Sequence, residues 1–176
     1  MLLTTERLHI RHITENDWES MKEIWEDFNR SKYAQYDMPH ITEEADVRER
    51  IARWAKANSG MEHMFFAVCL HERIIGYIAF NIRDNGYEIG YCFHSDYCGK
   101  EYAKESHLAL FNHLHDLGIT RFSAGTAINN LPSVGLLKSL GFKQVGEEKV
   151  SFYKDAGGND IIFDGGIFEL DLEEVK

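Results

Sequence analysis

The segment from Glu88 to Ala103 constrains the fold more than any other part of the chain. It reads as a β-strand that ends near Phe93, a turn containing Gly99, and a helix that begins near Glu101. Such a turn leaves unpaired backbone N–H groups pointing beyond the end of the strand, where they can cradle a pyrophosphate. Roughly 30 residues later the chain reads Asn-Leu-Pro-Ser at 130–133 and Leu-Gly-Phe at 140–142. This order of motifs predicts one binding site for a phosphorylated cofactor.

The length and charge of the chain narrow the class of protein. The 176 residues suit one α/β domain spanning 1–176, since no linker or repeat divides them. The formal net charge of −10 argues against nucleic acid as a partner and favours cationic substrates. Residues 1–11 lack an apolar stretch of signal-peptide length, and no apolar run in the sequence approaches the roughly 20 residues that span a bilayer. We therefore expect a cytoplasmic protein with no membrane partner. Cys69, Cys92 and Cys98 are expected to be reduced thiols.

Hydrophobic periodicity predicts a mixed, mostly antiparallel twisted sheet of about seven strands with helices on both faces. Thr14, with Asp17 three residues later, is expected to cap the first helix, and Thr42 the second. Two further helices are expected to start near Glu101 and Asn130 and to end at glycines. The expected strands cover residues 8–12, 65–70, 74–82, 87–93, 121–126, 146–153 and 161–172.

With these motifs in this order, the chain resembles the GNAT acyltransferase superfamily, most closely its RimJ/RimL-like N-acetyltransferase branch. The resemblance implies the GNAT fold, acetyl-CoA as co-substrate, and a six-residue loop whose backbone amides hold the pyrophosphate. The matching residues are Cys98, Gly99, Lys100, Glu101, Tyr102 and Ala103, with Lys100 and Lys104 adding positive charge. The fourth loop position is usually Gly in the family. Here it is Glu101, whose carboxylate would repel a pyrophosphate unless it points away.

Three side chains are candidates for the chemistry. Glu88 matches the glutamate that serves as general base in several relatives, with a solvent-facing strand carboxylate as the alternative. Ser133 matches a serine proposed to lie near the thioester sulfur in the RimJ/RimL-like branch, and helix capping is its alternative. Asn130 resembles the family asparagine that binds the pantetheine arm or the acceptor region, and its alternative role is to form the turn before a helix. Many relatives place a tyrosine, which can donate to the departing CoA thiolate, where this chain has Leu137. A leucine cannot fill that role, so no thiolate donor is expected at this position.

The resemblance also implies partners. The backbone at Phe93 and His94 is expected to pair with pantetheine like an added strand. The acceptor is expected to be a primary amine, either a ribosomal-protein or other peptide N-terminus or a small amine, acetylated by direct transfer in a ternary complex. The departures at Glu101 and Leu137 leave open a non-catalytic acyl-CoA-binding or sensor domain on the same fold. The sequence also leaves open a homodimer.

Two further hypotheses, a histidine metal site and an acidic site for a cationic amine, have less support in the sequence. His107, His113 and His115 share one predicted helix, but spacings of six and two residues do not place them on one face. We therefore expect no metal site and histidines that are solvated or half-buried. Asp37, Glu43 and Glu44, near the aromatic-rich stretch around Tyr33 and Tyr36, could attract a cationic amine. Such a charge cluster is more often a solvated helix start, so no substrate contact is assigned to it.

Overall fold

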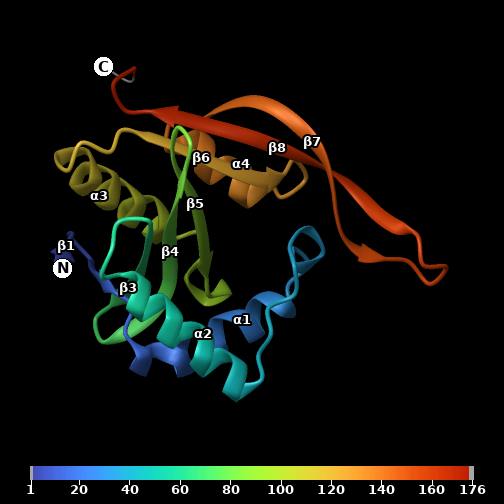
Figure 1. Ribbon diagram of the computed structural model, residues 1–176, viewed down its shortest axis with the longest axis horizontal. Coiled ribbons are helices and arrows are strands. Elements are labelled where there is room, and N and C mark those ends of the chain that lie inside the picture. Colours follow the sequence, from blue (N-terminus) through green and yellow to red (C-terminus); the bar gives the residue numbers. More distant parts are fainter. Residues whose placement is uncertain (1, 175–176) are drawn as a thin grey trace.

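One eight-stranded mixed sheet organises the chain (Figure 1). The computed structural model describes residues 2–174. The strand order is β1-β2-β3-β4-β5-β6-β8-β7, and every neighbouring pair is antiparallel except β5 with β6. The strands are β1 (Leu2–Thr4), β2 (Leu8–His12), β3 (His63–Leu70), β4 (Arg73–Arg83), β5 (Gly86–Phe93), β6 (Arg121–Ala127), β7 (Lys143–Lys154) and β8 (Asp160–Asp171).

Helices cover both faces of this sheet (Figure 1). On one face lie α1 (Trp18–Asn29) and α2 (Glu44–Ala57), and on the other lie α3 (Tyr102–Asp116) and α4 (Leu131–Ser139). Short 3-10 turns connect them, namely η1 (Glu15–Asp17), η2 (Ala34–Tyr36) and η3 (Ser95–Tyr97). Within residues 2–174, none of the helices has the length and apolar character needed to cross a bilayer.

The α1/α2 face is held by an apolar stripe at helical spacing. Met21, Ile24 and Trp25 are fully buried on α1, and the indole N–H of Trp25 donates to the Tyr77 hydroxyl at 3.1 Å. Trp54 on α2 stacks on Phe65 with ring centroids 4.3 Å apart. Each fully buried side chain of this size stabilises the fold by about 2 kcal/mol. The stripe therefore fixes both helices against β3 and β4.

On the other face, α3 and α4 both end at a glycine in the left-handed conformation. Gly118 (φ 81°) follows α3 and Gly141 (φ 94°) follows α4, both in the left-handed region. The Ile119 N–H then donates to the Leu114 carbonyl at 2.9 Å, and the Phe142 N–H donates to the Leu137 carbonyl at 3.0 Å. These bonds satisfy the last carbonyls of each helix and turn the chain back toward the sheet.

The parallel pair β5 and β6 separates soon after it begins. Tyr87 pairs with Phe122 and Glu88 with Ser123, but no further pairs form although β5 continues to Phe93. On its other edge β5 stays paired with β4 along its whole length. A parallel pair that stops after two residues leaves unpaired strand edges facing each other, and this opening positions the candidate site.

A long β7–β8 hairpin extends from the far edge of the sheet (Figure 1). β8 pairs with β6 only from Gly165 onward, so the segment 160–164 extends beyond β6 and is paired within the sheet to β7. The hairpin contacts the connection between α1 and α2, where the Tyr153 hydroxyl donates to the Ala34 carbonyl at 2.9 Å. Phe163 meets Tyr36 edge to face at 5.6 Å. The hairpin and the α1–α2 connection therefore both contribute residues to the wall of the same cavity.

The expected mixed sheet with helices on both faces is confirmed, with three local differences. The sheet has eight strands because the three-residue β1 pairs with β2, and so short a strand carries no readable periodicity. The cap of α2 is Glu43, not Thr42. Thr14 and Asp17 do form the capping pair, with the Thr14 N–H donating to Asp17 Oδ2 at 2.7 Å, but a turn of 3-10 helix precedes α1.

Candidate functional site

A cavity of about 820 Å³ lies where β5 and β6 separate. Its size is in the range typical of small-molecule and cofactor sites. The wall contains all of the predicted site residues except His94 and Lys100. Those that line it are Glu88, Phe93, Cys98, Gly99, Glu101, Tyr102, Ala103, Lys104, Asn130 and Ser133. The structure thus brings together two motifs that are far apart in the sequence.

The turn before α3 presents unpaired backbone donors. Within residues 2–174, the N–H groups of residues 99–104 donate to no protein acceptor, whereas the Glu105 N–H bonds the Glu101 carbonyl at 2.9 Å. Arg7 donates to the Lys100 carbonyl at 3.1 Å. Because the peptide unit is planar and trans, the N–H of the same peptide points away from Arg7. A free run of donors at the start of a 15-residue helix suits a bound pyrophosphate.

Glu101 occupies the fourth position of the six-residue loop 98–103. Its φ of 65° and ψ of 4° are left-handed, as is the φ of 73° at Gly99. The Glu101 side chain is exposed and makes no hydrogen bond within the described residues. The turn therefore accommodates a glutamate at this position at the expense of local backbone strain.

Glycines leave room for a ligand along both strand edges and on α4. A Cβ added at Gly90, Gly125 or Gly135 would meet no heavy atom within 4 Å, and all three residues line the cavity. Gly135 lies in the interior of α4, where glycine is less favourable for the helix than a residue with a side chain. Free backbone donors at one end and open glycine surfaces along the walls together fit an extended phosphorylated cofactor such as acetyl-CoA.

Glu88 lines the cavity at the last position where β5 pairs with β6. It lies on the sheet face that carries Cys92, toward α1 and α2, while Tyr87 and Ile89 point into the opposite core. Its carboxylate pairs with the Arg83 guanidinium across the β4–β5 hairpin, and its side chain is 40% exposed. Glu88 is therefore both a solvent-accessible strand carboxylate and a lining residue of the cavity, so both readings of the sequence have a structural basis.

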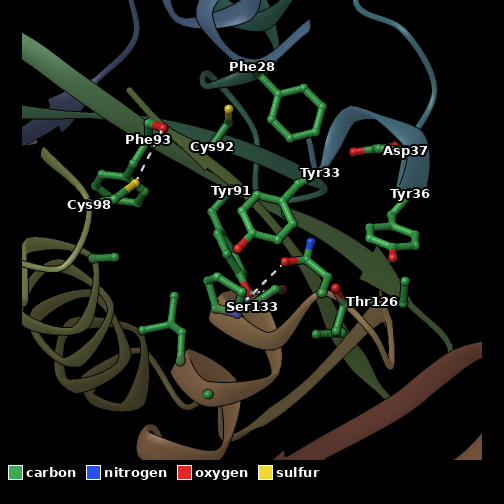
Figure 2. A pocket seen from close by; sticks show the side chains of 18 of the residues that line it. Phe28, Tyr33, Tyr36, Asp37, Tyr91, Cys92, Phe93, Cys98, Thr126 and Ser133 are labelled. Carbon is green, nitrogen blue, oxygen red and sulfur yellow. Dashed lines mark hydrogen bonds between the residues drawn. The ribbon is translucent and has the colours of Figure 1, made fainter. Parts of the chain in front are cut away.

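Asn130 and Ser133 divide the roles that the sequence left open. Asn130 is the N-cap of α4, and its Oδ1 lies 3.5 Å from the Ser133 backbone N–H. Ser133 therefore does not cap the helix. Its hydroxyl instead lies 2.8 Å from the hydroxyl of Tyr91 on β5 (Figure 2). Both hydroxyls face the cavity, and burial raises the pKa of Tyr91 to about 12.

The side chains of His94 and Lys100 are engaged outside the cavity wall. His94 Nδ1 accepts from the Asp96 backbone N–H at 3.2 Å, and the His94 backbone N–H donates to the Ile75 carbonyl at 2.9 Å. The Lys100 ammonium donates to the Asp96 carbonyl at 2.8 Å. The His94 carbonyl also accepts from the Tyr97 N–H at 3.0 Å, so the backbone groups expected to pair with pantetheine are already engaged at His94. Lys100 contributes its backbone N–H and the general positive charge of the turn.

An aromatic and acidic wall faces Ser133 across the cavity. Phe28, Tyr33, Tyr36 and Asp37 descend from α1 and the connection to α2 (Figure 2). Asp37 Oδ1 accepts from the Met38 N–H at 2.7 Å, and no ion-pair partner for Asp37 is found in residues 2–174. Nearby protein atoms displace water from this carboxylate and raise its pKa. An unneutralised carboxylate beside aromatic rings favours a cationic group as neighbour.

Sequence reasoning missed parts of this site and one buried group. The hairpin residues Phe152 and Phe163 line the cavity, and only their alternation on β7 and β8 could have suggested a shared face. His107 is fully buried on α3, so the expectation of a solvated or half-buried histidine is wrong there. Leu137 is also fully buried in the α3/α4 core and lies outside the cavity wall. Within residues 2–174, no cluster of three His, Cys, Asp or Glu side chains could hold a metal ion.

Comparisons with known proteins show the family and the fold of the chain. The profile described as "Acetyltransferase (GNAT) domain" matches residues 7–143. The uncharacterized N-acetyltransferase YnaD of Bacillus subtilis (strain 168) is 30% identical over 151 residues, which cover 83% of this chain and 85% of YnaD. A GNAT-family acetyltransferase from Bacillus anthracis superposes with a TM-score of 0.75 at 26% identity, covering 98% and 99% of the two chains.

The fold is shared with more distant enzymes as well. RimL, a ribosomal L7/L12 alpha-N-protein acetyltransferase solved in complex with coenzyme A, gives a TM-score of 0.83 at 17% identity, with 98% of this chain and 99% of RimL covered. At this identity the likeness concerns the fold. The profile match and the similarity to YnaD go further, and they show that this chain is an N-acetyltransferase that belongs to the GNAT acetyltransferase family.

Proposed function

We propose that the protein uses acetyl-CoA to acetylate a primary amine by direct transfer, the amine being a peptide N-terminus or a small cationic molecule. The observation that carries the proposal is the single cavity that joins the free N–H groups of residues 99–104 to Glu88 and Ser133. Two solved structures with the same fold, RimL and the acetyltransferase MccE, contain coenzyme A and acetyl-CoA respectively. Their contents support the co-substrate.

The chain would hold the co-substrate mainly through backbone groups. The N–H donors of the turn and the first residues of α3 would bind the pyrophosphate, with the positive end of the α3 dipole behind them. Lys104 adds a cationic side chain to this part of the wall. The unpaired edge of β5 beyond Glu88 offers further donors and acceptors to an extended arm of amide groups. When bound, acetyl-CoA supplies an acyl group on a good thiolate leaving group.

The transfer step requires a neutral amine. Glu88 is positioned on the cavity wall to accept the proton of an ammonium acceptor, either directly or through one water molecule. Glu88 passes this proton to solvent and is a carboxylate again before the attack. As the neutral amine nitrogen bonds to the acetyl carbon, the carbon–sulfur bond breaks, its electron pair passes to sulfur, and the second proton of the nitrogen leaves to Glu88. The thiolate then takes a proton from solvent as CoA departs. The Ser133 hydroxyl would donate a hydrogen bond to that developing thiolate. Holding both substrates in one cavity supplies a large part of the rate by proximity.

The acceptor wall favours a positively charged substrate. Asp37 lacks an ion-pair partner in the described part of the chain, and Tyr33 and Tyr36 offer ring faces beside it. The net charge of −10 adds long-range attraction for cations. A peptide N-terminus and a small diamine share this chemistry, and the alpha-N-protein activity in the name of RimL supports the former.

The proposal is tested by binding and turnover measured on the same protein. Isothermal titration with acetyl-CoA and with CoA should give dissociation constants in the micromolar range. Release of free thiol should then be followed with a panel of peptides bearing free N-termini, of diamines, and of the same peptides with blocked N-termini as matched controls. Acetylated product with free peptides or diamines, and none with blocked peptides, is the expected result. Absence of acetyl-CoA binding would refute the proposal, and binding without transfer to any amine would leave a non-catalytic binding domain.

A further inference from the structure

A hydrogen bond between Tyr91 and Ser133 joins strand β5 to helix α4 inside the site. The two hydroxyl oxygens lie 2.8 Å apart, although the residues are 42 positions apart in the sequence. Tyr91 comes from β5 beyond its last pair with β6, and Ser133 comes from the first turn of α4 (Figure 2). Both side chains line the cavity. The bond therefore spans the floor of the site at the point where β5 and β6 have separated.

The chemistry of the two hydroxyls determines the direction of this bond. A phenol is a far stronger acid than an aliphatic alcohol, so Tyr91 is the better donor and Ser133 the better acceptor. Burial raises the pKa of Tyr91 to about 12, so the phenol stays protonated at physiological pH. Within residues 2–174, the Ser133 hydroxyl has no protein partner besides Tyr91. When Tyr91 donates to Ser133 Oγ, the proton of Ser133 remains free to point into the cavity.

The Tyr91 ring is held by a neutral histidine. His107 packs edge to face against it, with ring centroids 4.9 Å apart. His107 is fully buried, and its Nδ1 lies 2.6 Å from the Ala103 carbonyl, which can only accept. Nδ1 therefore carries the proton, and burial lowers the pKa of His107 to about 4, so the ring stays uncharged. This contact ties the Tyr91 ring to the first turn of α3, directly after the turn that presents its N–H groups.

We propose that Tyr91 is a positioning residue for acetyl transfer: its hydroxyl donates to Ser133 Oγ and thereby directs the Ser133 proton at the sulfur of the departing thiolate. The inference rests on the proposed function. In the step itself the neutral amine nitrogen bonds to the acetyl carbon and the carbon–sulfur bond breaks with its electron pair staying on sulfur. The remaining excess proton of the nitrogen leaves to Glu88, and the thiolate takes a proton from solvent. No proton passes through Tyr91. Its effect is cooperative, because a hydroxyl that accepts a hydrogen bond becomes a stronger donor.

The experiment measures how the protein stabilises the thiolate of CoA. The dissociation constants of CoA and of desulfo-CoA, which lacks the thiol, are determined from about pH 6 to about pH 10, spanning the thiol pKa. Wild type, Tyr91→Phe, Ser133→Ala and the double variant are compared. Desulfo-CoA reports the fold and the rest of the binding site, so its affinity should stay within about twofold in all four proteins. The ratio of the two affinities isolates the interaction at sulfur.

In the wild type, CoA should gain affinity over desulfo-CoA as pH rises through the thiol pKa. Loss of a hydrogen bond to a charged acceptor predicts that Ser133→Ala removes roughly a tenfold or larger gain. Tyr91→Phe should remove most of the same gain, and the double variant should remove no more than Ser133→Ala alone. Acetyl-transfer turnover should fall in parallel, with the KM for acetyl-CoA little changed. Ser133→Thr, which keeps a hydroxyl, should retain the gain.

Other outcomes would overturn the inference in distinguishable ways. If Tyr91→Phe keeps the full pH-dependent gain while Ser133→Ala loses it, Ser133 contacts the sulfur and Tyr91 does not position it. If neither single variant changes the gain, the pair does not act on the leaving group. If neither CoA nor desulfo-CoA binds to the wild type, the proposed function itself fails together with this inference.

Discussion

Replacing Glu101 with glycine should stabilise the protein and tighten acetyl-CoA binding for two separable reasons. The first is conformational, because Glu101 has a φ of 65°. A residue with a Cβ in the left-handed region costs roughly 1–2 kcal/mol, and the greater freedom of glycine in the unfolded chain returns about 0.5–1 kcal/mol. The net gain is on the order of 0.5–1 kcal/mol, which in a protein of this size raises Tm by about 1–4 °C.

The second reason is electrostatic. Glu101 belongs to the turn whose N–H groups would hold the pyrophosphate, and its side chain is exposed. For a unit charge and a dianion in a medium close to water, Coulomb's law gives a repulsion of roughly 1 kcal/mol at a separation of about 7 Å, the reach of one glutamate side chain and a hydration shell. Removing the charge should therefore lower the dissociation constant of acetyl-CoA about fivefold at low ionic strength. Added salt should reduce this gain because exposed charges are screened.

Matched variants separate the two effects in thermal unfolding and isothermal titration. Glu101→Gln removes the charge and keeps the Cβ, so it should improve affinity without raising Tm. Glu101→Asn should recover part of the stability, since asparagine tolerates the left-handed region. The reasoning would be refuted if Glu101→Gly were no more stable than Glu101→Gln, or if the affinity of Glu101→Gln stayed equal to that of wild type at low salt.

Three further predictions follow from the same geometry. Glu88→Gln should lower turnover by about 10²–10⁴-fold while the acetyl-CoA affinity measured by titration stays within about twofold, and an unchanged turnover across the pH range would remove Glu88 as the base. Gly135→Ala should raise the free energy of unfolding by about 0.5–1 kcal/mol, because a Cβ there meets no protein atom, and should weaken acetyl-CoA binding because Gly135 lines the cavity; tighter binding would contradict that placement. Burial lowers the pKa of His40 and His107 to about 4, so the unfolded chain binds more protons than the folded one between about pH 4 and pH 6.5. Stability should therefore fall as pH drops through this window, by about 1.4 kcal/mol per pH unit for each histidine, and denaturant unfolding of His107→Gln should show a shallower slope than wild type.

Much of the fold could be read from local patterns. The stripe Met21, Ile24 and Trp25 has helical spacing because one face of α1 is buried, and the structure confirms it. Gly118 and Gly141 mark helix ends because the chain there needs a positive φ. The local patterns gave wrong predictions where contacts elsewhere in the structure outweighed the usual preference of a residue. Thr42 is a good capping residue, yet α2 begins at Glu44, and His107 is polar, yet it is buried where Ala103 offers a carbonyl.

The candidate site was readable in part. The turn residues and Asn130 and Ser133 lie along recognisable motifs, and the structure places them on one cavity wall. The function assigned to each of them stays a prediction. The reach of the β7–β8 hairpin to the α1–α2 connection was not readable, because Tyr153 and Ala34 are 119 positions apart and neither stands in a motif.

The sequence by itself determined the elements, their order and the turn that presents backbone donors. These features depend on the periodicity of side chains and on the φ angles that individual residues tolerate, and both are local properties. Only the tertiary structure decided that β5 and β6 separate after Glu88, that Tyr91 meets Ser133, and that Asp37 lacks an ion-pair partner within the described residues. Strand pairing, hydrogen bonds between distant residues and desolvation arise from packing of the whole chain, so no segment carries them alone.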